Sequence, residues 1–523
     1  MKPWQPATKQ YVIISLIALV VVNIIALGIP EPAYTDAYYY FNAGQRLATG
    51  EGLTDPYIAL TYLNAPESLP APAHTYWMPL TSLLVALAGG SFRAAQVIFS
   101  ACWLALVLLA FWLGARLGGS PRHAWAAGLL MIFCGYFAPF LVTTDTFAPY
   151  GVFGAFCLLA LGWGLTRQSW RWFALAGALA ALAHLTRADG LLLLGVLGLL
   201  AVVPGRWLNG AHITQRPYWQ CTLFNLGSGV LAYLLVMLPW FLRNMRLVGT
   251  PLPVGGTATI WLRGYNEIVS YPPAMNPANF LTWGLPNILQ SRWEALLTNL
   301  GTFVAVEGLI VLAPLIIIAL VKRWRHPLLL PVWIYAVLLH LAMTLAFAYP
   351  GLRGGLFHSA AALMPWWMAL GIIGLDDVID WIARRRRTWR PAQAKWIFTG
   401  AVIVLAILLT ITMTRGRFGQ RGGGTLTRLA ADVLPADAVV MSNDPTAFYY
   451  HTGLPGLVVP QAGLDGVQAL VTQYNLTHIV LDSNHTLPLA GLYNGTESAD
   501  FLRLVEQNID PTSRVFEVIP PGS

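Results

Sequence analysis

Long apolar runs and short polar loops alternate along the chain from residue 11 to residue 413. The hydrocarbon core of a bilayer requires about 20 apolar residues per helix, and on this basis the pattern predicts about eleven transmembrane helices. One apolar run contains Arg187 and Asp189. We interpret it as two short spans that meet at a turn, because a single helix would place basic loops on both sides of the membrane. The predicted spans are residues 11–29, 93–115, 124–142, 147–166, 171–186, 190–204, 222–242, 302–321, 327–349, 359–382 and 395–413.

Composition supports this interpretation. Of the 523 residues, 56% are hydrophobic and 10% are charged, and the mean hydropathy is +0.59. This balance excludes a soluble protein of this length and indicates a polytopic α-helical membrane protein. The net charge of +8 reflects lysines and arginines clustered in short loops between apolar runs, which argues against nucleic-acid binding. These loops share one side if every span crosses once, and the positive-inside rule assigns that side to the cytoplasm.

We therefore expect a multi-pass protein of the plasma membrane with a cytoplasmic N-terminus. The first apolar run, Tyr11 to Ile29, is long and lacks a small-residue cleavage site, so we interpret it as an uncleaved helix rather than a signal peptide. The composition, rich in Ala, Leu, Gly and Arg, is typical of a bacterium with GC-rich DNA.

The opposite side collects a large first loop, about residues 30–92, and the chain after residue 413. Within the first loop, Pro79 to Gly90 is apolar but too short to span, so we expect an interfacial or re-entrant helix there. Residues 414–523 alternate predicted strands and helices, which indicates a small extracytoplasmic α/β domain with a mostly parallel sheet. The predicted strands are 438–442, 457–460, 478–481 and 514–519, and the predicted helices are 425–433, 445–450, 464–474 and 498–506.

Two acidic residues at the predicted outer surface are candidates for catalysis. Asp36 follows the first span within a few residues, next to Tyr38 and Tyr39, and a carboxylate so close to the membrane is costly without a function. Asp145 lies in a short loop between two spans. If the two converge, one suits a general base on an acceptor and the other an orienting or binding group. Two alternatives remain open: Asp36 marks the interface, or Asp145 caps the next helix.

Positively charged candidates lie on the same predicted side. A guanidinium offers a planar fork of donors that suits a phosphate, and Arg187 can serve this role unless it pairs only with Asp189. Arg353 and His358 precede or open span 359–382 from the same side. The glycine-rich run around them lets the backbone approach a ligand closely.

His74 adjoins two aromatic residues of the first loop, Tyr76 and Trp77. This group suits stacking and hydrogen bonding with a sugar, and the alternative is an aromatic belt with an interfacial histidine. Acids, arginines and aromatic residues thus line the outer end of an apolar bundle. A ligand with an anionic head and a lipid tail satisfies both parts of such a site. A carboxylate there can deprotonate a nucleophile that attacks the carbon next to the phosphate.

These residues carry a resemblance to a known family. The first span followed by Tyr34-Thr-Asp36 resembles the first outer loop of GT-C membrane glycosyltransferases, in particular glycosyltransferase family 39. This family includes protein O-mannosyltransferases and the aminoarabinose transferases of lipid A. His74-Thr-Tyr-Trp-Met-Pro79 resembles its proline-containing stretch before an interfacial helix, and Leu185-Thr-Arg-Ala-Asp-Gly190 is similar to its Thr-Arg-Pro-Glu/Asp-Gly run. Arg353 to Pro365 resembles its Arg-to-Pro segment near the last spans.

The resemblance implies a GT-C-like fold and a single inverting transfer of a sugar from a polyprenyl-phosphate donor to a lipid, glycan or protein acceptor. It implies that Asp36 is the catalytic base and Asp145 the second carboxylate. Many members carry an acidic pair where this chain has Asp36 and Ala37. We therefore predict no required metal or other cofactor, with a divalent metal left open. The predicted substrate-binding residues are Tyr38, Tyr39, His74, Arg187, Asp189, Arg353 and His358.

Two other classes compete with this prediction. A lipid or glycan transporter also uses charges within the membrane, but the sequence shows no internal repeat of the kind that transporter folds contain. An assembly subunit with a degenerate site would tolerate replacement of Asp36. The large first loop and the C-terminal polar segment favour the enzyme.

Overall fold

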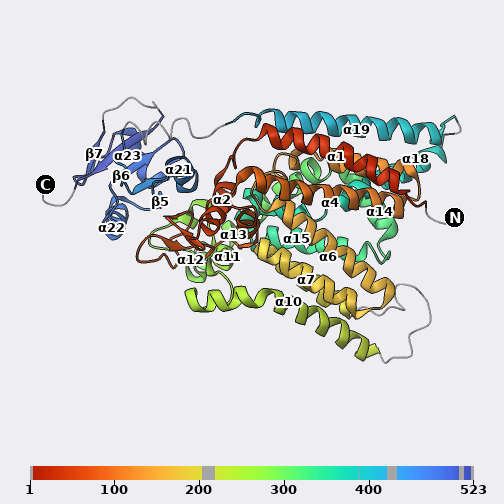
Figure 1. Ribbon diagram of the computed structural model, residues 1–523, viewed down its shortest axis with the longest axis horizontal. Helices are drawn as coiled ribbons and strands as arrows, with labels where there is room; N and C mark the ends of the chain where they lie inside the picture. The colour runs from red at the N-terminus through yellow and green to blue at the C-terminus, as the bar shows by residue number, and fades with distance from the viewer. Residues whose placement is uncertain (1–3, 203–217, 387, 421–432, 506–511, 520–523) are drawn as a thin grey trace. The chain divides into compact units, whose positions relative to one another are not determined.

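The computed structural model of the protein describes residues 4–202, 218–386, 388–420, 433–505 and 512–519 (Figure 1). The chain forms two compact units, which are described separately below. Unit 1 consists of Met1–Pro30, Gln96–Phe241 and Ser291–Gly419. Unit 2 consists of Glu31–Ala95, Leu242–Gln290 and Gln420–Ser523. The domain boundary near residue 414 stays a prediction.

Five helices among the described residues are long and apolar enough to cross a membrane. They coincide with the spans predicted at 11–29, 93–115, 147–166, 222–242 and 395–413. Several such helices in one chain make a multi-pass membrane protein. They are α1 (Thr8–Gly28), α4 (Phe92–Gly118), α6 (Phe147–Arg167), α10 (Tyr218–Val248) and α19 (Pro391–Arg415).

The other predicted spans form shorter or bent helices. The segment predicted as one span at 327–349 forms part of two helical runs, Leu330–Ala346 and Ala348–Ala360, which meet at 114°. Pro350 helps to explain the bend, because its ring would clash with the carbonyl of Ala346 in a straight helix. The count of about eleven spans stays a prediction. The shorter helices are α5 (Pro121–Ile132), α7 (Trp170–Thr186), α8 (Leu191–Ala201), α13 (Leu285–Thr302), α14 (Ala313–Arg323), α15 (Leu330–Leu341), α16 (Ala348–Pro350), α17 (Leu356–Ala360) and α18 (Met364–Ala383).

Three π-helical segments among the described residues interrupt the bundle, and the sequence pattern did not predict them. They lie where an apolar run continues but the regular hydrogen bonding of the α-helix does not. Such segments often occur at functional sites. They are η5 (Phe303–Glu307), η6 (Ala342–Ala346) and η7 (Gly351–Gly355).

The predicted break in the apolar run at residue 187 is confirmed. α7 ends at Thr186, Arg187 is extended, and α8 begins after the 3-10 turn η2 (Ala188–Gly190). A Cβ atom at Gly190 would lie 2.3 Å from the backbone nitrogen of His184, so this turn requires glycine. The break leaves Arg187 and Asp189 next to helix ends, where their side chains reach neighbouring helices.

Close backbone contacts hold the helices of unit 1 together. Small residues allow such contacts in membranes, and a Cβ at Gly374 of α18 would lie 2.0 Å from the carbonyl oxygen of Leu315 in α14. α19 lies alongside α1 (Figure 1), and the N–H of Gly419 donates to the carbonyl of Gly28 at 2.9 Å. The largest buried side chains of this unit include Trp103, Trp366 and Trp367.

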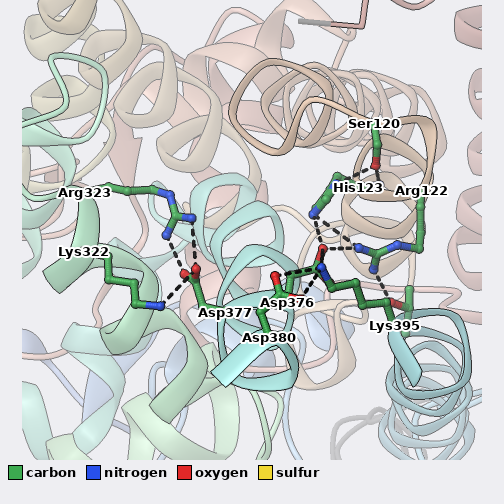
Figure 2. A network of polar contacts seen from close by, with 10 residues as sticks. Ser120, Arg122, His123, Lys322, Arg323, Asp376, Asp377, Asp380 and Lys395 are labelled. Carbon is green, nitrogen blue, oxygen red and sulfur yellow. Dashed lines mark hydrogen bonds and ion pairs between the residues drawn. The ribbon is translucent and has the colours of Figure 1, made fainter. Parts of the chain in front are cut away.

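An ionic network joins α5, α14, α18 and α19 at one end of unit 1 (Figure 2). Three aspartates near the end of α18 lie at its centre. Each of them contacts at least one cation from a neighbouring helix. The pairs are Asp376 with Arg122, His123 and Lys395, Asp377 with Lys322 and Arg323, and Asp380 with Lys395.

Unit 2 contains most of the first loop. Its helix α2 (Thr35–Ala48) packs closely on α3 (Leu80–Leu87), because a Cβ at Gly44 would lie 2.6 Å from the carbonyl oxygen of Ser82. α3 confirms the helix predicted within Pro79 to Gly90. The other helices of unit 2 are α11 (Val254–Ala258), α12 (Pro277–Thr282), α21 (Pro445–Thr452), α22 (Leu464–Tyr474) and α23 (Ala490–Asn494).

The C-terminal segment forms a six-stranded sheet in the order β2-β5-β4-β6-β8-β7. β4 (Val440–Ser442), β5 (Gly456–Val458), β6 (His478–Leu481) and β8 (Arg514–Val518) confirm the four predicted strands. The pairings β2-β5, β5-β4 and β4-β6 are parallel, and β6-β8 and β8-β7 are antiparallel. β2 (Tyr57–Ile58) comes from the first loop, so this loop and the C-terminal segment share one sheet.

Two details of this segment differ from the prediction or fall outside it. The helix predicted at 498–506 is wrong, because Leu502–Leu504 forms strand β7. Its backbone pairs with β8, and Arg503 bonds Glu517 across the two strands at 2.5 Å. This pairing outweighs local helix propensity. The helix predicted at 425–433 lies outside the described residues except for its last position. The remaining strands, β1 (Thr54–Asp55) and β3 (Ala71–Pro72), pair with each other.

Candidate active site

Asp145 lies in the loop before α6 and is fully buried. Its Oδ1 accepts a hydrogen bond from the N–H of Thr146 at 2.5 Å, and its Oδ2 lies 3.0 Å from Nε2 of His358. The N-cap residue of α6 is Thr146, without a side-chain cap, so the structure does not use Asp145 as the cap. A buried carboxylate depends on specific donors instead of water, and His358 supplies one.

His358 is held by contacts at both ring nitrogens and at one ring face. Nδ1 lies 2.7 Å from the carbonyl oxygen of Gly354, Nε2 faces Asp145, and the ring stacks on Phe147 with centroids 3.9 Å apart. A carbonyl and a carboxylate both accept hydrogen bonds, so each ring nitrogen of His358 faces an acceptor. The pair places an imidazole and a carboxylate in direct contact, and both are groups that can take part in acid–base chemistry.

A local departure from helical geometry places these groups. Within η7, Arg353 has φ −98° and ψ 20°, and Gly354 has φ 102° and ψ 0°. The positive φ favours glycine, and it lets the carbonyl of Gly354 accept from His358 four residues later. Arg353 is exposed at the same break.

Asp189 joins the break after α7 to helix α17. Its Oδ2 accepts from Nε of Arg187 at 3.1 Å and from Oγ of Ser359 at 2.6 Å. Ser359 directly follows His358, so two successive residues of α17 contact the two acidic residues Asp145 and Asp189. The pairing of Arg187 with Asp189, which the sequence left as one alternative, is present.

Two buried tyrosines extend this network. The hydroxyl of Tyr335 donates to the carbonyl oxygen of Ser359 at 3.2 Å, and it lies 2.8 Å from the hydroxyl of Tyr150. α6, α15, α17 and the turn after α7 are therefore linked by polar contacts within an apolar bundle. Such contacts fix the orientation of the helices that carry Asp145 and His358.

In unit 2, Asp36 is half-buried in the first turn of α2. The helix dipole favours a negative charge at this position. The preceding residue, Thr35, donates from Oγ1 to Oδ2 of Asp444 at 2.6 Å, and its carbonyl accepts from Oγ1 of Thr446 at 3.0 Å. Helix α21 and its N-cap Asp444 therefore fix the backbone position of Asp36.

Further contacts tie α2 to α21. Nδ2 of Asn42 donates to the carbonyl of Thr446 at 2.9 Å, and Nη1 of Arg46 donates to the hydroxyl of Tyr449 at 3.2 Å. Tyr38 donates to Glu31 at 3.0 Å, and burial raises the pKa of this tyrosine. Its hydroxyl is therefore a hydrogen-bonding group and not a base.

Tyr39 and His74 meet at a third carboxylate, Asp55. The hydroxyl of Tyr39 donates to Oδ2 of Asp55 at 2.9 Å and accepts from the backbone N–H of His74 at 2.7 Å. Burial raises the pKa of Asp55 to about 7, although the Tyr39 hydrogen bond and the charges of Arg46 and Arg243 oppose this. Burial lowers the pKa of His74 to about 3. His74 is thus neutral near pH 7, whereas Asp55 titrates there.

The structure groups the predicted site residues within each unit. Unit 1 connects Asp145 with His358 and Arg187 with Asp189, and the two pairs meet at α17. In unit 2, the hydroxyl of Tyr39 accepts a hydrogen bond from the backbone N–H of His74. The hydroxyl of Tyr38 donates to Glu31 instead. Sequence analysis missed several residues of these networks, because no spacing or motif marks them: Asp55, Tyr150, Tyr335, Ser359 and Asp444.

Comparison with family models found no match for the chain, and neither did comparison with curated proteins. Comparison with solved structures did. The chain is similar to the crystal structure of ArnT from Cupriavidus metallidurans bound to undecaprenyl phosphate. The sequence identity is 14%, the TM-score is 0.55, and 99% of each chain is covered. The apo form of the same protein gives a TM-score of 0.53 at 14% identity, over 98% of each chain.

A second similar structure is the archaeal oligosaccharyltransferase AglB from Archaeoglobus fulgidus, in complex with an inhibitory peptide and a dolichol-phosphate. The identity is 13% and the TM-score 0.51, over 90% of this chain and 69% of that chain. This chain has the GT-C fold. At these identities the similarity concerns the fold alone, and it confirms the fold expected from the motifs around Asp36, His74 and Arg187. The match to ArnT extends over the membrane helices and the C-terminal segment of this GT-C chain.

Proposed function

We propose that the protein is a membrane glycosyltransferase that moves a sugar from a polyprenyl-phosphate donor to an acceptor on the outer face of the membrane. The similarity to ArnT bound to undecaprenyl phosphate, over 99% of both chains, carries this proposal. The AglB structure contains a dolichol-phosphate, which is also a polyprenyl lipid phosphate. The acceptor is a lipid, a glycan or a protein side chain.

In the proposed reaction, Asp36 is the general base. It accepts the proton of the acceptor hydroxyl while the oxygen forms its bond to the anomeric carbon. The bond from that carbon to the phosphate oxygen breaks in the same step, and the polyprenyl phosphate leaves with the electron pair. A single displacement inverts the configuration of the sugar. Asp36 suits this role because the contacts of Thr35 with Asp444 and Thr446 fix its backbone.

The other candidate residues have supporting roles in this proposal. Asp145 is the second carboxylate, and its partner His358 orients it through the contact of Nε2 with Oδ2 at 3.0 Å. Arg187, Arg353 and His358 stabilise the departing phosphate, whose charge grows in the transition state. Asp189 keeps Arg187 in place. Tyr38, Tyr39 and His74 line the sugar or acceptor side, and the proposed reaction uses no metal ion.

The membrane arrangement proposed with this function follows the positive-inside rule. About eleven spans place the N-terminus in the cytoplasm of a bacterial cell. The first loop and residues 414–523 then lie outside the plasma membrane. Sugar transfer takes place on that side, where the polyprenyl-phosphate head group meets the acceptor.

A transfer assay in proteoliposomes tests the proposal. Radiolabelled polyprenyl-phosphate sugars are supplied to the wild type and to Asp36→Asn, and we expect the variant to lose about 10²–10⁴-fold in rate, the usual contribution of a general base. Asp465→Asn, at an exposed position of α22, makes the same chemical change away from the proposed site and should transfer at the wild-type rate.

The outcomes separate the competing functions. Unchanged transfer by a folded Asp36→Asn protein would move the base to another residue, and Asp145 is the first alternative. No transfer from any donor, together with movement of labelled lipid between leaflets, would identify a transporter. Neither transfer nor lipid movement would favour an assembly subunit.

A further inference from the structure

Several helix ends of unit 1 meet around the ionic network of Figure 2. Contacts of Asp376, Asp377 and Asp380 bring the start of α5, the end of α14 and the start of α19 to the end of α18. The end of α6 joins them, because a Cβ at Gly162 would lie 2.9 Å from Leu328, in the loop after α14. We call this region the basic end of unit 1.

The acidic residues of the basic end are used internally. Among the described residues, the acids of these helix ends are the three aspartates of α18, and each already contacts a cation of the bundle. Arg167 and Arg385 are exposed and make no ion pair with a described acidic residue. The outer part of the basic end therefore has an excess of positive charge that the described chain does not neutralise.

These two arginines share a specific geometry, because each lies over indole rings. The guanidinium carbon of Arg167, at the end of α6, lies 5.3 Å from the ring centroid of Trp163 and 4.8 Å from that of Trp172 in α7. The two indoles are themselves 4.6 Å apart. The guanidinium of Arg385 lies 3.9 Å over Trp381, which is half-exposed at the end of α18.

Stacking of this kind has a chemical consequence. An indole within about 6 Å attracts a guanidinium through a cation–π interaction, and neither arginine has its N–H donors in an ion pair with a described acidic residue. The planar fork that binds phosphate with two hydrogen bonds is thus available at these exposed side chains. Tryptophan is also typical of the depth at which lipid head groups lie.

From this geometry we propose that the basic end of unit 1 binds the phosphates of anionic phospholipids, with Arg167 and Arg385 as the binding side chains. The ligand is the head group of a lipid such as phosphatidylglycerol in the leaflet at that end. The charge of the lipid complements the unneutralised arginines, and the exposed Trp381 contacts the glycerol and the upper acyl chains. This site is separate from the proposed transfer reaction and does not depend on it.

The test measures thermal unfolding of the purified full chain in detergent micelles during titration with phosphatidylglycerol or phosphatidylcholine. We expect phosphatidylglycerol, but not phosphatidylcholine, to raise the unfolding temperature of the wild type. Each arginine should contribute about fivefold in apparent affinity, which corresponds to about 1 kcal/mol per basic residue at a membrane surface. Arg167→Gln/Arg385→Gln should therefore need about 25-fold more phosphatidylglycerol for the same effect.

Two further variants isolate the role of geometry from that of charge. Arg503→Gln/Arg514→Gln removes two exposed positive charges from strands of unit 2 and should respond like the wild type. Arg167→Lys/Arg385→Lys keeps the charge but loses the stacked fork, and its affinity should lie between those of the wild type and the glutamine variant. Equal unfolding temperatures without added lipid establish that all variants are folded.

Some results would overturn the proposal. Equal stabilisation by phosphatidylcholine would show that the lipid charge is irrelevant, and an unchanged response of Arg167→Gln/Arg385→Gln would show that these arginines do not bind the head group. If undecaprenyl phosphate stabilised the wild type through these arginines and phosphatidylglycerol did not, the site would belong to the donor lipid.

Discussion

Two aspartates of unit 1 are held in opposite ways. Asp376, at the basic end, contacts Arg122, His123 and Lys395, so two permanent cations face one carboxylate. Asp145 is fully buried, and its Oδ2 lies 3.0 Å from Nε2 of His358. A carboxylate between permanent cations is held in its ionised form. A carboxylate in contact with a histidine has a neighbour of the residue type that most often acts as a general acid or base.

This difference separates a structural acid from one suited to chemistry. The network around Asp376 joins four helices through ion pairs and hydrogen bonds (Figure 2). The network around Asp145 reaches Ser359 and Asp189 through one turn of α17, and it lies next to the irregular segment η7. Asp145 and Arg122 are both buried polar groups, so burial by itself does not distinguish the two networks. The identity of the partner does.

The largest expected effect concerns the Asp145–His358 pair. Asp145→Asn keeps the size of the side chain but removes the carboxylate that faces Nε2 of His358. We expect the rate of sugar transfer to fall about 10²-fold or more, as for the loss of an acid–base group. The measurement is kcat and KM in proteoliposomes, and a change mainly in kcat supports a role in the transition state.

His358→Gln serves as the companion variant, because it preserves a donor toward Asp145 but removes the imidazole ring. Its loss of kcat should resemble that of Asp145→Asn, and the double variant should lose little more than either single one. Additive losses would show that Asp145 and His358 act independently. The claim that the histidine partner distinguishes Asp145 from Asp376 would then be wrong.

The second effect concerns the stability of the fold and tests the structural role of Asp376. Asp376→Asn leaves Arg122 and Lys395 without their counter-charge in a region where Arg122 is only 8% exposed. Removal of one partner from a buried ion pair costs about 3 kcal/mol, so the unfolding temperature of the purified protein should fall clearly. Transfer activity per folded molecule should stay near the wild-type value, because no proton exchange is lost.

Asp380→Asn is the matched control for this experiment. Asp380 belongs to the same helix, but its side chain is 45% exposed and it pairs with Lys395 alone. Exposed pairs contribute less than about 1 kcal/mol, so the unfolding temperature should barely change. If Asp376→Asn instead lowered kcat as strongly as Asp145→Asn in fully folded protein, the structural role assigned to the basic end would be wrong.

Sequence patterns predicted the parts of the molecule that depend on local regularity. The apolar runs predicted the five long helices, the alternation after residue 433 predicted β4, β5, β6 and β8, and the charges with Gly190 predicted the break after α7. Each of these follows from residues close together in sequence, because hydrophobic period and turn chemistry are local properties. The GT-C-like fold was expected from the order of short motifs, and the structure confirms it.

Patterns failed where distant residues decide the structure. No turn signal in the sequence marks the π-helical segments η5 and η6, and β2 pairs with a strand about 400 residues later. Asp55 shows the same limit within the candidate site. Nothing in Thr54-Asp55 marks a buried carboxylate, because its burial arises only when Tyr39 of α2 and the backbone of His74 close around it.

The smallest expected effect concerns Asp55. Among the described residues, this carboxylate contacts neither a histidine, as Asp145 does, nor permanent cations, as Asp376 does. It is buried like Asp145, accepts a hydrogen bond from Tyr39 and makes no ion pair with a described residue. Its pKa is raised from 3.8 to about 7 by burial, so the folded chain keeps a proton that the unfolded chain releases. The contribution of this group to stability is therefore complete below pH 3.8 and decreases as the pH rises to about 7.

Asp55→Asn removes this dependence, because asparagine is neutral at every pH and its carbonyl still accepts from Tyr39. We expect the unfolding temperature of the variant, relative to the wild type, to increase by a few degrees from acidic pH to pH values above about 7. Thermal unfolding of both proteins is measured across this pH range, and the wild-type unfolding temperature is subtracted from that of the variant at each pH. The titration of all other groups is common to both proteins and cancels in this difference. A difference that stays constant with pH would mean that Asp55 is already ionised in the folded protein, and that Arg46 and Arg243 neutralise it as cations neutralise Asp376.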